Sequence, residues 1–162
     1  MTTRDDAIAA LDRTRAELLD AIRGLDERAL DRKGAVGDWS IKNMLAHIAA
    51  WEEWVVQALP ARLAAATTPP DMRARLQDED RFNAEEVAER EELTPGEQLM
   101  ELERTRAELL AYLRGLDQPT LARAQPWDTW PGTIPDYLLV SLRDHEAEHI
   151  EALRAAAAEV IR

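Results

Sequence analysis

Twice in this chain the sequence reads Arg-Thr-Arg-Ala-Glu-Leu-Leu, at Arg13–Leu19 and again at Arg104–Leu110. The flanks also agree, since a leucine lies two residues before each copy and Arg-Gly-Leu-Asp follows a few residues after it. Corresponding residues lie 91 positions apart. Seven consecutive identities are hard to explain by similar helix composition alone, so we predict two related halves.

Each copy lies on an amphipathic helix that is followed by a loop and a second helix. The first helix is predicted over residues 3–25, and the second copy lies on a helix that Thr94-Pro95-Gly96-Glu97 opens with a capping box. The partner helices are predicted over 39–63, with Ser40 as N-cap, and from about 133 towards the C-terminus. Two such halves bury their apolar stripes only by packing together, which predicts an all-α four-helix bundle. The polar segment 71–92 is predicted to be an extra, peripheral helix.

Composition narrows the function classes. The 162 residues fit one domain, and alanine, leucine, glutamate and arginine favour helices. There is no cysteine, no apolar leader and no apolar run of membrane-spanning length, so we expect a cytoplasmic protein without a membrane partner. The formal net charge is −12, and no basic cluster stands clear of the acidic residues, which predicts no nucleic-acid partner.

The three histidines of the chain form the candidate site. His145 and His149 are four residues apart, so both project from one face of the last predicted helix. His47 lies on the second predicted helix. A pair at this spacing and one imidazole from a facing helix could bind a divalent metal through three nitrogens. The alternative is that all three are ordinary surface or core histidines.

Two other metal sites are weighed against this one. His145-Glu-Ala-Glu-His149 matches the H-E-x-x-H helix of zinc proteases, but no downstream histidine follows and no substrate-binding strand is predicted. Glu146-x-x-His149 matches half of a di-iron carboxylate site. The second half is missing, because Met44 lies three residues before His47.

The motifs around these histidines resemble a known family. Trp39-Ser-Ile-Lys42, followed by Leu45-Ala-His47-Ile48, and the pair His145-x-x-x-His149 are similar to the DinB/YfiT-like superfamily of small bacterial four-helix bundles. The resemblance covers nearly the whole chain, and implies one bundle domain over 1–162. It also implies a divalent metal, zinc or nickel, at His47, His145 and His149. Characterised relatives are thiol-dependent transferases and isomerases that use low-molecular-weight thiols, and a related branch hydrolyses a reactive genotoxin.

Tryptophans are concentrated around the candidate site. Trp51 and Trp54 share a helix face with His47, and Trp127 and Trp130 lie in a Pro-rich loop before the last helix. We expect these four to wall a small-molecule pocket, with Trp51 and Trp54 as core residues the alternative. The function expected is a metal-dependent transferase or hydrolase, with a thiol as co-substrate in the first case. The alternative is a non-catalytic metal-binding or small-molecule-sequestering bundle, with a homodimer as one arrangement.

Overall fold

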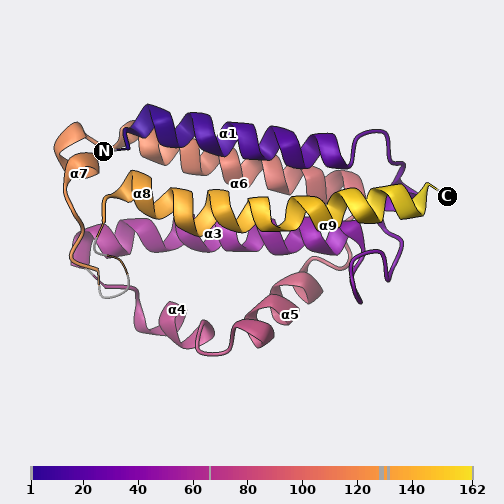
Figure 1. Cartoon of the computed structure of the whole chain (residues 1–162). Coiled ribbons are helices and arrows are strands. Elements are labelled where there is room, and N and C mark those ends of the chain that lie inside the picture. Colours follow the sequence, from indigo (N-terminus) through magenta and orange to yellow (C-terminus); the bar gives the residue numbers. More distant parts are fainter. Residues whose placement is uncertain (1, 66, 128–129, 131, 162) are drawn as a thin grey trace.

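The computed structural model describes residues 2–65, 67–127, 130 and 132–161, and its main helices form a four-helix bundle (Figure 1). Three of them are α1 (Arg4–Ala21), α3 (Ile41–Ala65) and α6 (Pro95–Gly115). The fourth is a continuous run of α8 (Ile134–Leu138), the π-helical segment η1 (Leu139–Asp144) and α9 (His145–Val160). The shorter helices are α2 (Glu27–Leu30), α4 (Pro70–Arg75), α5 (Glu79–Glu89) and α7 (Gln118–Ala122). The predicted all-α bundle is therefore confirmed.

Side chains at the N-termini of the long helices determine where those helices begin. Thr3 and Thr94 each form a capping box, with Asp6 and Glu97 respectively, which satisfies backbone N–H groups of the first turn. The hydroxyl of Ser40 accepts a hydrogen bond of 3.1 Å from the backbone N–H of Asn43. The caps predicted at Ser40 and Thr94 are thus present.

The two halves are related by a pseudo-twofold axis that crosses the bundle near its middle. In Figure 1, α1 and α6 run in opposite directions, and so do α3 and the C-terminal helix, as such an axis requires. Helix α3 packs along α6, and α1 packs along α9. The buried apolar residues form two clusters, one around Leu11 and Leu109 and the other around Leu18 and Leu102.

Four charged side chains, which we name the central quartet, lie buried near this axis: Arg15, Glu52, Arg106 and Glu146. Arg15 contacts Glu146 at 2.8 Å and Glu52 at 3.1 Å, while Arg106 contacts Glu146 at 2.7 Å and also binds Glu52. All four side chains are at most 8% exposed. The repeated Arg-Thr-Arg motif therefore supplies the two cations of a buried ion network.

Main-chain contacts of the two arginines show the same symmetry. Arg15 donates to the carbonyl of Leu102, and Arg106 donates to the carbonyl of Leu11, its repeat counterpart. Helices α1 and α6 are thus joined by a reciprocal pair of hydrogen bonds.

The π-helical segment explains the register of the second half. Ser40 and Thr133 cap equivalent helices and lie 93 residues apart, whereas the equivalent carboxylates Glu52 and Glu146 lie 94 apart. A π turn takes in one residue more than an α turn, and η1 lies between Thr133 and Glu146. The π turn absorbs this extra residue, so Glu146 faces the two arginines as Glu52 does from the other half.

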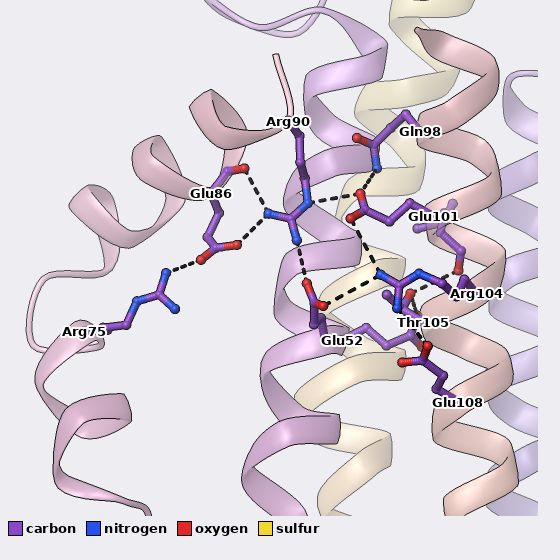
Figure 2. Close-up of polar contacts among 11 residues, drawn as sticks. Glu52, Arg75, Glu86, Arg90, Gln98, Glu101, Arg104, Thr105 and Glu108 are labelled. Atoms are coloured by element: carbon purple, nitrogen blue, oxygen red, sulfur yellow. Dashed lines mark hydrogen bonds and ion pairs between the residues drawn. The ribbon is translucent and has the colours of Figure 1, made fainter. Parts of the chain in front are cut away.

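The peripheral segment 71–92 contains two short helices, α4 and α5, with a break between them at 76–78. Figure 2 shows how Arg90, just after α5, fastens this segment to the bundle. Its guanidinium contacts Glu86 at 2.6 Å, Glu53 at 2.6 Å and Glu101 at 3.0 Å. Since Glu53 lies on α3 and Glu101 on α6, one side chain joins three helices.

Among the residues that the structure describes, none of the helices has both the length and the apolar character needed to cross a membrane.

Candidate metal centre

The three histidine rings converge between α3 and the start of α9. The Nε2 atom of His145 lies 3.0 Å from Nε2 of His47 and 3.3 Å from Nε2 of His149. The two helices are antiparallel, so His47 near the start of α3 faces the first turn of α9. His47 is 5% exposed, and the other two are partly buried.

The spacing of these nitrogens suits a metal ion. Ligand atoms of all three histidines lie within 4.8 Å of one another. Imidazole nitrogens bind zinc at 2.0–2.1 Å, so tetrahedral ligands lie about 3.3 Å apart, close to the two distances observed. Three nitrogens fill three positions of a tetrahedral site and leave one open. The donor set therefore fits a divalent ion.

Burial keeps the imidazoles in the form that a metal requires. It lowers the pKa of His47 to about 3 and that of His145 to about 4, and the neighbouring histidines add to both shifts. Burial also lowers the pKa of His149, against the opposing effect of Glu148 and Glu146. The rings are thus neutral near pH 7, with nitrogen lone pairs free for a cation.

Among the residues that the structure describes, no carboxylate forms a hydrogen bond or ion pair with His47. Its Nδ1 atom is buried without a hydrogen-bond partner, and the ring of Trp39 lies 5.4 Å from its own, centroid to centroid. Glu146, although next to His145 in sequence, turns away into the central quartet. Contacts with neighbouring rings therefore orient His47. No carboxylate motif in the sequence could have predicted this orientation.

A pocket of about 670 Å³ extends from the histidines along the groove between α3 and the C-terminal helix, with α4–α5 on its outer side. Of the four tryptophans predicted around the site, Trp51, Trp54 and Trp130 line this pocket. Trp127 is not among the lining residues. It is buried beside the pocket, where its indole N–H donates to the carbonyl of Arg62 and its ring packs edge-on against Tyr137. Asp128, Thr129 and Pro131 of the same loop lie outside the described residues.

Arg62, Tyr137 and Asn83 also line the pocket, and sequence reasoning did not single them out as site residues. Arg62 continues the helix face of His47 and Trp51, and that periodicity was the available signal. Asn83 lies on α5, and its side-chain oxygen accepts a 2.9 Å hydrogen bond from the indole N–H of Trp51. No local pattern indicates which face of such a polar segment meets the bundle.

Two solved structures share this fold. An uncharacterised protein from Escherichia coli UTI89 superposes with a TM-score of 0.80 at 16% identity, covering 98% of this chain and 95% of that one. The colibactin self-resistance protein ClbS, solved in complex with double-stranded DNA, superposes with a TM-score of 0.75 at 13% identity and 94% coverage of both chains. No curated protein matches the sequence.

The prediction that the protein has no nucleic-acid partner, which was drawn from its net charge, is wrong. ClbS has this fold and its crystal structure contains double-stranded DNA. A formal charge of −12 is a sum over the whole chain, whereas a nucleic-acid contact depends on the groups at the contact itself. Composition therefore does not exclude such a partner for a bundle of this type.

Comparison with family models places the chain in a known superfamily. The model of the DinB superfamily matches residues 10–153, which include both repeat copies, the central quartet and all three histidines. The chain belongs to the DinB superfamily.

Proposed function

We propose that His47, His145 and His149 hold one divalent metal ion, zinc or nickel, and that the chain is an enzyme acting on a small molecule in the adjoining pocket. The observation that carries this proposal is the convergence of three neutral imidazoles, one buried and two partly buried, at the end of an aromatic-lined pocket. Membership of a superfamily of metal-binding bundles supports it.

Three neutral ligands leave the charge of the ion uncompensated, because Glu146 is held in the central quartet. An ion at this position would act as a Lewis acid that lowers the pKa of a coordinated water or thiol. The surrounding chain contributes orientation and water exclusion. The ring of Trp51 lies 5.8 Å from that of His145, and Trp54 extends the apolar wall.

Two reaction types fit this arrangement: transfer of a low-molecular-weight thiol to an electrophile, and hydrolysis of a reactive small molecule. The colibactin self-resistance role of ClbS supports a reactive small molecule as the substrate class. The alternative is a bundle that binds metal or sequesters a small molecule without turnover. Contact with double-stranded DNA, as in the ClbS complex, is a further candidate activity.

Metal analysis of the purified protein tests the metal proposal. We expect one equivalent of metal in wild type and almost none in a His145→Ala, His149→Ala double variant. Glu151→Ala is the matched control, since Glu151 lies on the same helix with an 81% exposed side chain. Equal, sub-stoichiometric metal in wild type and double variant refutes the site.

Turnover separates the enzyme from the sequestering bundle. Electrophiles are incubated with the zinc- or nickel-loaded protein, with and without a thiol and with and without chelator. Chelator-sensitive turnover supports the enzyme, and tight binding without turnover across the panel supports sequestration. A mobility-shift assay with double-stranded DNA, in wild type and in the double variant, tests the DNA contact independently of metal.

A further inference from the structure

Arg62 is a buried cation at the end of the pocket remote from the histidines. It is 6% exposed and, among the described residues that line the pocket, is the only lysine or arginine. Within the part of the chain that the structure describes, no carboxylate lies within ion-pair distance of it. Buried arginines ordinarily have a carboxylate partner, as Arg15, Arg90 and Arg106 do here.

The hydrogen-bonding capacity of Arg62 is only partly used. Its Nε donates to the hydroxyl of Thr68 at 2.8 Å, while Nη1 is fully buried without a partner. A buried charged donor without an acceptor is costly, so an acceptor from a ligand would be favoured at this atom.

Aromatic rings surround the guanidinium. Its central carbon lies 5.4 Å from the ring centroid of Trp54, and 5.2 Å from those of Trp127 and Tyr137. These rings stabilise a positive charge through their faces but supply no acceptor for Nη1. They hold the cation at the wall of the pocket, with Nη1 still unpaired.

The distance between the two ends indicates an elongated ligand. His47 and Arg62 lie 15 positions apart, which corresponds to about 22 Å along the axis of α3. The arginine side chain leans towards the helix N-terminus and shortens this gap. Between the ends lie mainly aromatic and aliphatic groups, among them Trp51, Val55 and Tyr137, with the exposed carboxylates of Glu79 and Glu148 also on the lining.

We propose that Arg62 binds the carboxylate of an elongated ligand whose aromatic or aliphatic body lies along the tryptophans and whose other end reaches the histidines. A carboxylate suits the site better than a phosphate, since a single guanidinium is the one basic side chain on the described lining and matches the single charge of a carboxylate. This inference names the ligand class of the proposed function and rests on it only for the chemistry at the histidine end. The carboxylate belongs either to the electrophilic substrate or to the thiol.

The test is calorimetric titration of the whole chain with phenylalkanoates of increasing chain length and with their neutral amides. For the best length, we expect wild type to bind the carboxylate at least about tenfold more tightly than the amide. Arg62→Met should abolish this preference without weakening the amide, and Arg62→Lys should restore part of it. Arg81→Met, at an exposed arginine outside the pocket, is the control and should behave as wild type.

Equal binding of carboxylate and amide by wild type overturns the proposal, as does an undiminished preference in Arg62→Met or no binding of any chain length at millimolar concentration. Tighter binding of the matching phenylalkyl phosphate overturns the choice of carboxylate. If Arg62→Met does not fold, the wild-type preference and its reduction in Arg62→Lys decide the matter.

Repeating the titrations on metal-free protein and on His145→Ala, His149→Ala separates this inference from the metal proposal. A carboxylate preference that survives in both supports the Arg62 subsite even if no metal binds. In cobalt-loaded protein, mercaptooctanoate and mercaptooctanol identify the source of the carboxylate. If mercaptooctanoate gives a stronger sulfur-to-cobalt absorption band than mercaptooctanol, and Arg62→Met removes this difference, the carboxylate belongs to the thiol. If the two compounds give equal bands, the carboxylate belongs to the electrophile.

Discussion

Replacing Glu52 by glutamine removes one of the two carboxylates of the central quartet. Glu52 accepts hydrogen bonds from Arg15 at 3.1 Å, from Thr105 at 2.9 Å and from Arg106, with a side chain 2% exposed. In the variant two guanidinium groups, at most 8% exposed, share the single charge of Glu146. One buried positive charge is then uncompensated, which costs about 3–5 kcal/mol.

For a chain of this size, such a loss in the free energy of unfolding lowers the Tm by about 6–20 °C. Urea unfolding in the presence of chelator, followed by circular dichroism and tryptophan fluorescence, measures it without a contribution from bound metal. The control is Glu108→Gln, which breaks the 2.8 Å pair of Arg104 and Glu108, both half exposed, and should cost less than about 1 kcal/mol.

A loss in Glu52→Gln no larger than in the control would refute the reasoning that the quartet holds two mutually dependent charge pairs. Apolar replacement of all four members distinguishes charge from packing. Because it leaves no unpaired ion, we expect that variant to be more stable than Glu52→Gln.

Three further predictions concern the histidines and the π-helical segment. One equivalent of zinc should raise the Tm of wild type but not of His145→Ala, His149→Ala, and chelator should reverse the rise, as differential scanning fluorimetry would show. Since the folded-state pKa values of His47 and His145 are about 3 and 4, below the unfolded value near 6.5, the unfolded chain binds protons first as the pH falls. The free energy of unfolding of metal-free protein should therefore fall by up to about 1.4 kcal/mol per pH unit for each of these histidines between pH 6.5 and 4. It should fall less steeply in His145→Gln, and an equal dependence on pH in that variant contradicts the prediction. Deleting Val140, a half-exposed residue of η1, should convert the π turn into an α turn, give Thr133 and Glu146 the same spacing as Ser40 and Glu52, and keep metal binding; loss of metal from this variant but not from Val140→Ala would contradict the register argument.

The bundle could be predicted because its determinants are periodic. The apolar stripes, the capping sequences at Ser40 and Thr94, and the repeated Arg-Thr-Arg motif are each visible in the sequence. The approach of His47 to the later histidine pair followed from the repeat, because two related halves bring distant helices together.

Other features depend on contacts that no local pattern encodes. The π-helical segment has no characteristic composition. Its one trace in the sequence is that the offset between the two halves is one residue larger at Glu52 and Glu146 than at Ser40 and Thr133. Arg15 and Arg106 lie on the apolar stripes, but a lone arginine at such a position can equally extend to solvent. The role of Arg62 depends on Trp127 and Tyr137, which approach it only in the folded chain. Net charge is a sum over the whole chain and does not describe the charges at any one surface, so it could not exclude a contact with DNA.

The pseudo-twofold axis has a consequence for how this pocket can diversify. The axis exchanges the two ends of the groove, so the position of His149 on one side corresponds to Val55 on the other, towards Arg62. The proposed metal end and the proposed Arg62 end therefore occupy related places in the two halves, but each carries its own residues on its own helix. If both proposals hold, substitutions around Arg62 would change the ligand bound there and leave the three histidines in place.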